Sequence, residues 1–439
     1  MDTLLELAEL VKKETNGTKL VGTYYFHTFG ASYVGKFGIR SIARILESPY
    51  IDLLNAPSYH QRAAGMSDAF PGPEGSLRLH SKSHFKEEDV RTFLSKQNYS
   101  KIHTVYDSIS VIKRDFILAL TKHTGLWWFD LHGGWFRNDA LSEAMEIEKK
   151  LMEKAAQGNE IKNQIAVFVD DQTLNYLNFS SENILRSFIS VEQKSSLGLI
   201  GAPYDCYLLS DLNKIKTADY RLFIFLDTFK IDNETRKIIK EKIEVRGNTI
   251  LWFYAPGFIK DEALSNDSMN DLISIKTAVC NEIQKASIKT SAVPNVFLKD
   301  YEDKAFSANC QLNPYFHSID EAAQVIGRFD NGKAGLVYKK LANGATSIFC
   351  SSPGLPPVIL RNIAEYAGVH LYVTTNDAVY ATSDFFGIHA ASGGSKEIKF
   401  KEKRRLYDPF TGETLKENTD SVKFGMQKNE TIILELQQL

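Results

Sequence analysis

The sequence of 439 residues lacks the features that mark membrane, exported and metal-binding proteins. No apolar run reaches the ~18 residues of a membrane span, and the acidic, amphipathic segment 1–17 does not have the pattern of a signal peptide. The cysteines show neither Cys-x-x-Cys nor the Cys/His spacing of a zinc site; they are Cys206, Cys280, Cys310 and Cys350. Glycine-rich nucleotide-binding fingerprints are also absent. We therefore predict no metal, no cofactor and no membrane partner, and the localisation stays unknown.

An excess of charge of either sign is missing as well. The 52 Lys and Arg residues nearly balance the 54 Asp and Glu residues, which leaves a net charge of −2. So small a charge does not recruit nucleic acid or an anionic membrane surface. A neutral substrate fits this balance, and the aromatic fraction of 11% supplies rings that suit a sugar site as well as a core.

The sequence does have a regular alternation of strand-like and helical segments over residues 1–157. The expected strands are 20–29, 50–57, 76–85 and 125–131, and the expected helices are 4–14, 37–48, 87–97, 105–123 and 139–156. Strands separated by helices are typical of parallel sheets and of (β/α) barrels. Because a complete barrel needs eight strands, we expect this part to form about half of one.

Two further domains are expected after a charged linker. Near-continuous apolar runs are typical of strands buried on both faces of a parallel sheet; they lie at 165–170, 204–212, 220–229 and 248–257. We therefore predict a doubly wound α/β domain over 158–372. From 373 to 439 the helical spacing gives way to short alternating segments separated by Gly, Asn and Pro, which predicts a small β-sandwich.

Candidate site residues follow the expected barrel strands, because functional groups in a (β/α) barrel lie at the C-terminal ends of the strands. They are Tyr25, Asn55, Tyr59, Arg62, His84, Glu87, Glu88, Trp127, Trp128, Asp130 and Trp135. A retaining glycosidase needs two carboxylates ~5 to 5.5 Å apart. Aromatic rings stack on the apolar face of a sugar while polar side chains bind its hydroxyls. The set predicts a pocket for a carbohydrate substrate.

Several blocks, taken in order, resemble the glycosidases of family 42. They are SPYIDLLNAPSYHQRAAG, GSLRLHSK, the pattern Phe85-x-Glu87-x-Asp89-x-Arg91-Thr92, IKRDFILALTKHTG and WWFDLHGGWF. Further along, GAPYDCYLLSDL and the segment from VIGRFDNGKAG to NIAEYAGVHLY resemble the trimerisation domain of β-galactosidases in that family, and LYDPFTGE resembles their small C-terminal β domain. The resemblance spans nearly the whole chain, and no single block would suffice for it.

The resemblance implies a retaining, β-galactosidase-like hydrolase. It implies about strands 5 to 8 of a (β/α)8 barrel over 1–157, a flavodoxin-like or amidotransferase-like trimerisation domain over 158–372, and a β domain over 373–439. The nucleophile falls on Glu87, with Glu88 as the fallback. The acid/base glutamate of the family, which follows the fourth strand, has no counterpart, so a separate N-terminal barrel half is an implied partner. A homotrimer is implied as well.

Other interpretations of the same residues stay open. Glu87, Glu88 and Asp89 also fit the acidic first turn of a helix. Because Trp127 and Trp128 alternate across a strand, at most one of them is expected to touch sugar. Arg62 equally fits a structural ion pair. Cys206 is expected to be a core thiol, since it lacks the Gly-x-Cys-x-Gly elbow of an amidotransferase nucleophile. A catalytically incomplete fragment that acts as a carbohydrate-binding or oligomerisation module remains the alternative function.

Overall fold

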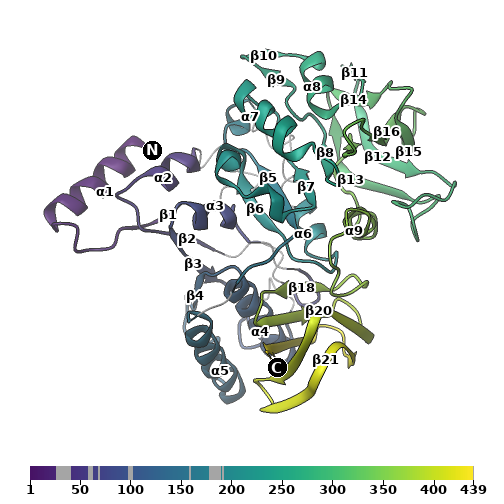
Figure 1. The fold of residues 1–439 in the computed structure, drawn as a ribbon. Coiled ribbons are helices and arrows are strands. Elements are labelled where there is room, and N and C mark those ends of the chain that lie inside the picture. Colours follow the sequence, from purple (N-terminus) through teal and green to yellow (C-terminus); the bar gives the residue numbers. More distant parts are fainter. Residues whose placement is uncertain are drawn as a thin grey trace.

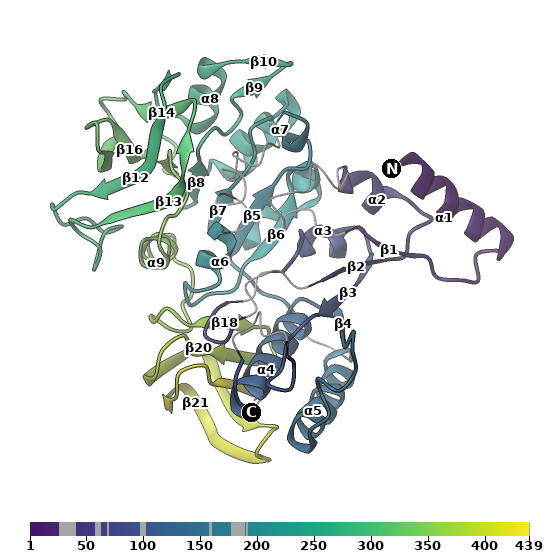
Figure 2. The same ribbon diagram turned by 180° about the vertical axis from the view of Figure 1, so that it is seen from behind.

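The structure is a computed structural model that describes residues 1–25, 41–57, 63–67, 70–96, 102–157, 160–176, 189 and 192–438. Within these residues the strands form a four-stranded sheet, a large mixed sheet, a five-stranded sheet and a short hairpin. Figures 1 and 2 show the three larger sheets as separate lobes that meet near the middle of the molecule, with α1 (Asp2–Glu14) projecting from one side. No helix in the described part has the length and hydrophobicity needed to cross a bilayer.

The first lobe is a parallel sheet with strand order β1-β2-β3-β4. The strands are β1 (Gly22–Tyr24), β2 (Leu53–Pro57), β3 (Ser83–Glu88) and β4 (Gly125–Trp128). The helices of this part are α1, α2 (Ile42–Glu47), α3 (Glu74–Leu79), α4 (Val105–Thr121) and α5 (Asp139–Ala155). Both long helices begin at polar caps: Thr104 accepts from the backbone N–H of Asp107, and Asn138 accepts from those of Ala140 and Leu141.

Two segments of this lobe differ from the sequence-based prediction. The expected strand 76–85 begins instead as helix α3, which buries Glu74, Ser76 and Leu77. The expected helix 87–97 is wrong, because Glu87 and Glu88 continue strand β3 by pairing with Trp127 and Trp128 of β4. Helical apolar spacing is thus overridden by a parallel ladder that depends on residues far along the chain.

The second lobe is built on five parallel strands in the order β6-β5-β7-β8-β17. They are β5 (Ile165–Val169), β6 (Asp205–Leu208), β7 (Leu222–Phe225), β8 (Thr249–Phe253) and β17 (Thr346–Cys350), and nearly every side chain in them is buried. In chain order this is 2-1-3-4-5, the order of flavodoxin-like doubly wound sheets. The associated helices are α6 (Gln193–Leu197), α7 (Asn233–Ile238), α8 (Asn266–Ile273) and α9 (Pro357–Tyr366).

An antiparallel extension lies between β8 and β17 in the chain, where the sequence had been expected to continue the doubly wound pattern. It comprises β11 (Thr277–Cys280), β12 (Gln284–Thr290), β13 (Ala305–Leu312), β14 (Tyr315–Ser318), β15 (Gln324–Phe329) and β16 (Ala334–Lys340). The hairpin of β9 (Ile259–Lys260) and β10 (Ala263–Leu264) precedes it. Strand β12 alternates buried and exposed residues, as expected for a sheet with one solvated face.

The C-terminal lobe, for which the sequence predicts a small β-sandwich, is one continuous hydrogen-bonded antiparallel sheet. Its order is β18-β19-β22-β20-β21, formed by β18 (Ala378–Ala381), β19 (Phe385–His389), β20 (Gly394–Asp408), β21 (Glu413–Met426) and β22 (Thr431–Gln437). Register shifts along β20 and β21 bend these long strands, so that a single sheet encloses its own apolar cluster. Helix α4 packs on β19, where Gly387 leaves room for Ile117.

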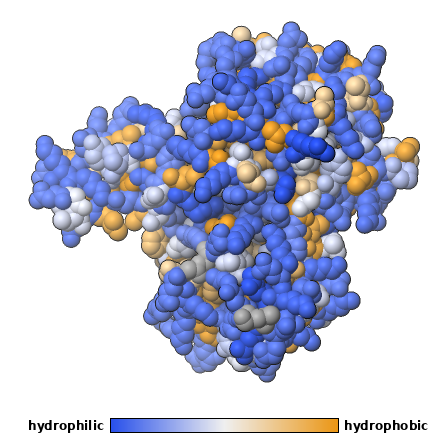
Figure 3. All heavy atoms as spheres, viewed as in Figure 1, coloured by the Kyte–Doolittle hydropathy of each residue, from blue (hydrophilic) through white to orange (hydrophobic). Residues whose placement is uncertain are grey.

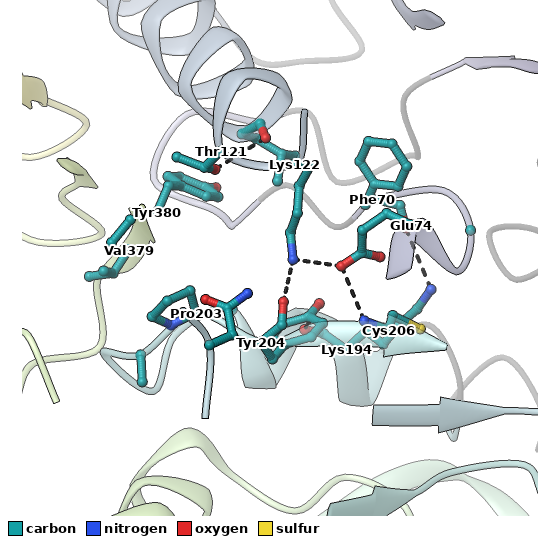
Figure 4. Close-up of a pocket in the computed structure, with 16 residues that line it drawn as sticks. Phe70, Glu74, Thr121, Lys122, Lys194, Pro203, Tyr204, Cys206, Val379 and Tyr380 are labelled. Carbon is teal, nitrogen blue, oxygen red and sulfur yellow. Dashed lines mark hydrogen bonds and ion pairs between the residues drawn. The ribbon is translucent and has the colours of Figure 1, made fainter. Parts of the chain in front are cut away.

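The first two lobes meet at Glu74 of α3, which is 1% exposed (Figure 4). Its Oε1 accepts from Lys122 Nζ at 2.6 Å and from the backbone N–H of Cys206 at 3.2 Å. Lys122 also donates to the carbonyl of Tyr204, and Ser76 Oγ accepts from the backbone N–H of Leu208 at 2.8 Å. Strand β6 is the edge of its sheet. Helix α3 therefore covers that edge and satisfies two of its backbone donors.

We predict that replacing Lys122 with Met destabilises the chain by about 3–5 kcal/mol, because the Glu74 carboxylate is left buried without its cation. Urea unfolding measures the effect. The double variant Lys122→Met, Glu74→Gln should recover part of the loss, since the amide oxygen still accepts from Cys206.

The exposed Arg44–Asp2 pair is the matched control, and Arg44→Met should change the unfolding midpoint little. Equal destabilisation by Lys122→Met and Arg44→Met would contradict the role given to this buried pair.

Candidate active site

The four-stranded parallel sheet has one covered face and one open face. Side chains that are paired across a ladder project to the same side of a sheet. The registers of Tyr24 with Asn55 and of Glu87 with Trp127 therefore place these four side chains on one face, at the carboxyl ends of the strands. This face is open to solvent: Tyr24 is 56% exposed and Phe85 is 42% exposed.

Tyr24 and Glu87 are joined across this face. Tyr24 Oη donates a hydrogen bond to Glu87 Oε2 at 2.9 Å. Partial burial and the neighbouring carboxylate raise the pKa of Tyr24 to about 12, so the phenol keeps its proton at neutral pH. A protonated phenol that donates to a carboxylate fixes the direction in which that carboxylate points. Glu87 is thus an oriented, partly exposed carboxylate at the end of β3.

The two neighbouring tryptophans lie on opposite faces of β4, as strand alternation predicts. Trp127 shares the open face with Glu87, to which it is paired in the ladder. Trp128 is on the covered face, where its ring lies 5.7 Å from that of Phe136 and packs against the cluster of Val90, Ile102 and Val111. Trp127 is therefore the ring available to a ligand on the open face.

The residues that alternate with Glu87 along β3 belong to the covered face. Glu88 is fully buried and forms an ion pair with the equally buried Lys86. Glu148 of α5, also buried, lies close enough for the charge of Glu88 to contribute to its raised pKa, of which burial is the main cause. His84 is 2% exposed and stacks at a tilt on Phe70. The fallback nucleophile Glu88 and the candidate His84 thus face the helices, away from Trp127.

Asp130 and Trp135 follow β4 and support the loop rather than line the open face. Asp130 Oδ2 accepts from the backbone N–H of Trp135 at 3.1 Å, and its Oδ1 is buried without a hydrogen-bond partner among the described residues. Trp135 is 5% exposed, and the Arg91 guanidinium lies 4.0 Å from the centre of its ring. The carbonyl of Trp135 accepts from Thr92. These contacts hold the 129–136 loop against the segment after β3.

The tyrosine that contacts Glu87 is Tyr24, the neighbour of the predicted site residue Tyr25. Tyr24 reaches Glu87, whereas Tyr25 is partly buried and packs against the core. A shift of one residue in a strand reverses the face of every side chain, and the sequence 20–29 does not fix where the strand begins. The candidates Tyr59 and Arg62 lie outside the described residues.

Two further observations in the described part bear on metal and cysteine chemistry. No group of three or more His, Cys, Asp or Glu side chains there has the arrangement of a metal site. Cys206 lines the pocket of Figure 4, but it is buried, and burial raises the pKa of its thiol to about 12. Because the thiolate is the reactive form of cysteine, this placement fits a core thiol rather than a nucleophile.

Exposed apolar residues also gather on the arm of the molecule that carries the open face. In α1, Leu7 is 58% exposed and Leu10 is 50% exposed, and Leu20 before β1 is 75% exposed. Figure 3 shows hydrophobic side chains at the surface of this arm among hydrophilic ones. Exposed apolar side chains beside the unpaired edge strand β1 are typical of a surface that packs against another protein segment.

Comparison with solved structures identifies the fold. No protein-family model and no curated protein matches the chain. Solved β-galactosidases do match: that of Rahnella sp. R3 with a TM-score of 0.64 at 11% identity, a GH42 enzyme of G. stearothermophilus with 0.63 at 12%, and that of Halorubrum lacusprofundi with 0.61 at 12%. The match covers 98%, 98% and 99% of this chain but 66%, 65% and 66% of those proteins, just under two thirds of their length. The chain has a mixed α/β fold like that of GH42 β-galactosidases.

We predict that His84 makes stability depend on pH. Burial, with a smaller effect of Lys86, lowers the pKa of His84 to about 3 in the folded chain, whereas an unfolded histidine titrates near 6.5. Below pH 6.5 the unfolded state therefore binds a proton that the folded state does not. As the pH is lowered from about 6.5 to 3, protonation of His84 in the unfolded state should reduce the free energy of unfolding by about 1.4 kcal/mol per pH unit.

Urea unfolding of the wild type and of His84→Gln at several pH values isolates this contribution, since the variant should lose that slope. Ile348→Val, a buried apolar substitution in another lobe, is the control and should lower stability equally at all pH values. Parallel curves for the wild type and His84→Gln would rule out the assignment.

Proposed function

We propose that this chain, which shares the fold of GH42 β-galactosidases, is the C-terminal part of a retaining glycoside hydrolase that acts on terminal β-galactosides. Glu87 is the nucleophile that attacks the anomeric carbon. Residues 1–157 form the second half of a (β/α)8 barrel, 158–372 a trimerisation domain and 373–439 a β domain. The active assembly is a homotrimer.

The observation that carries this proposal is the pairing of Glu87 with Tyr24 on the open face beside Trp127. A nucleophilic carboxylate must be held beneath the anomeric carbon, and the 2.9 Å hydrogen bond from Tyr24 restricts its rotation. Trp127 offers an aromatic ring for stacking on the sugar, and Asn55 carries an amide on the same face, although its Oδ1 is itself buried. These side chains meet the needs of one sugar subsite.

The mechanism needs a second carboxylate, as general acid and then base. Glu87 is the single acidic residue among the open-face positions of β1 to β4. We therefore assign the acid/base to a separate N-terminal barrel half that docks on the open face. The free edge of β4 supports this assignment, because a groove of about 400 Å³ runs beside it, lined by Phe85, Trp128 and Met152 among others.

In the reaction, the acid of the N-terminal barrel half protonates the glycosidic oxygen while Glu87 Oε1 or Oε2 forms a bond to the anomeric carbon and the aglycone leaves. The covalent glycosyl-enzyme is then hydrolysed by a water that the same second residue deprotonates. Tyr24 stays protonated throughout and holds the carboxylate of Glu87 in line.

The alternative is a carbohydrate-binding or oligomerisation module that never completes an active site. The exposure of Tyr24 and Phe85 favours it, since an open face can bind sugar without a general acid. Titration with galactose, followed by tryptophan fluorescence, would show saturable binding under either hypothesis. Hydrolysis of an aryl β-galactoside by the chain together with the N-terminal half separates the enzyme from the module. Light scattering coupled to size exclusion tests the trimer.

We predict that Glu87→Gln reduces turnover of an aryl β-galactoside by the assembled enzyme about 10³-fold or more, because the amide cannot form the glycosyl ester. Glu87→Gly with added azide should regain turnover and release the α-glycosyl azide, since the anion takes the place of the lost carboxylate.

Glu88→Gln is the positional control. It should lower the melting temperature, because Lys86 loses its buried partner, and leave the remaining folded enzyme active. Unchanged turnover in Glu87→Gln would remove Glu87 from the mechanism.

We also predict that Tyr24→Phe lowers kcat about 10- to 100-fold with a smaller change in KM, because a hydrogen bond to a charged group contributes about 1.5–3 kcal/mol. Tyr25→Phe alters the neighbouring phenol, which packs toward the core, and should leave kcat within about twofold. Equal kcat values for the two variants would show that the Tyr24 hydroxyl does not orient the nucleophile.

A further inference from the structure

A compact group of reactive side chains lies on the antiparallel extension of the mixed sheet, in a different lobe from the open face (Figure 1). Strands β11 and β14 pair antiparallel, with Cys280 opposite Tyr315 and Ala278 opposite His317. Cys280, Tyr315 and His317 therefore project from the same face of this ladder. Lys333, in the turn before β16, completes the group.

The Cys280 sulfur is in contact with a cation and with an imidazole. Lys333 Nζ lies 3.2 Å from Cys280 Sγ and donates to Tyr315 Oη at 2.9 Å. His317 Nδ1 lies 3.7 Å from the same sulfur. Asn331 Nδ2 also donates to Tyr315 Oη, at 3.1 Å. This second hydrogen bond restricts the position of the Tyr315 hydroxyl, which accepts from Lys333. Cys280 is partly exposed, so a small molecule in solution can reach it.

The charges of the neighbours suit a nucleophilic sulfur. Hydrogen bonds to Tyr315 and Cys280 raise the pKa of Lys333, which keeps it an ammonium ion at neutral pH. Burial, and then the charge of Lys333, lower the pKa of His317, which keeps its imidazole neutral and able to accept a proton. A cation beside the sulfur and a base within reach are the two elements that activate cysteine nucleophiles.

We propose that Cys280 is a modification site that reacts by exchange with low-molecular-weight disulfides. The thiol proton passes to His317, and the sulfur attacks one sulfur of the disulfide. A new S–S bond to Cys280 forms as the original S–S bond breaks, and the departing thiolate takes the proton back from His317. The reagent is itself the oxidant: one of its sulfurs is reduced to a thiol while Cys280 enters the mixed disulfide.

The remaining cysteines provide internal comparisons. Cys310 on β13 is also partly exposed, but burial raises the pKa of its thiol to about 11. Cys206 and Cys350 are buried, and burial raises the pKa of each to about 12. Cys310 is thus the matched control, because it is partly exposed like Cys280 and its thiol is one whose pKa burial raises.

The test treats the full chain with oxidised glutathione at pH 7 and locates the adducts by peptide mass spectrometry over time. We expect Cys280 to be modified first, about tenfold faster than Cys310. Lys333→Met should slow modification of Cys280 about three- to tenfold, and Lys333→Arg, which keeps the positive charge, should restore most of the rate. Lys304→Met is the control for loss of a lysine elsewhere on this extension and should change nothing.

Melting temperatures of all variants, measured alongside, show that each is folded. Equal rates at Cys280 and Cys310 would overturn the proposal, as would a Lys333→Met variant that reacts as fast as the wild type. None of these measurements uses glycosidase activity, so their outcome is independent of the function proposed for the open face.

Discussion

The arrangement of the first two lobes depends on one buried carboxylate, Glu74, which is shared by three elements. It accepts from Lys122 at the end of α4 and from the backbone of Cys206 on β6, while its own helix α3 lies along the edge of that strand. Burying this ion pair costs desolvation, and the cost is offset only because the partners are fixed at short range. The ion pair therefore fixes the position of α3 relative to α4 and β6, because its hydrogen bonds form in only one arrangement of these elements.

That placement also determines the geometry of the open face. Helix α3 leads directly into β3, and α4 leads directly into β4. The Lys122–Glu74 ion pair therefore fixes the first residues of the two strands that carry Glu87 and Trp127. The C-terminal sheet supports α4 from its other side, where the close approach at Gly387 admits Ile117. The candidate nucleophile thus projects from a strand held at its base by buried contacts, while its carboxylate is oriented by Tyr24 at the tip.

The sequence predicted the helices whose caps and apolar spacing are local, but not the strands whose formation depends on pairing with distant residues. Helices α4 and α5 were predicted to within a few residues, because Thr104 and Asn138 cap them and their apolar spacing is regular. The segment after Phe85 was misjudged, since its helical pattern is overruled by pairing with β4 and by the Lys86–Glu88 ion pair. Which of Tyr24 and Tyr25 faces Glu87 depends on where β1 begins, and the hydrophobic pattern of the sequence does not show this. The bend of β20 and β21 depends on irregularities in their pairing, which the pattern does not show either.

Because side chains alternate along strand β3, the adjacent residues Glu87 and Glu88 lie on opposite faces of the sheet. Glu88 forms an ion pair with Lys86 inside the protein, and its charge contributes to the raised pKa of Glu148, a second buried acid. Glu87, one residue earlier, lies on the open face, where the protonated phenol of Tyr24 donates a hydrogen bond to its carboxylate. In the proposed mechanism the open face supplies the nucleophile, and the proton that the leaving group needs comes from beyond these four strands.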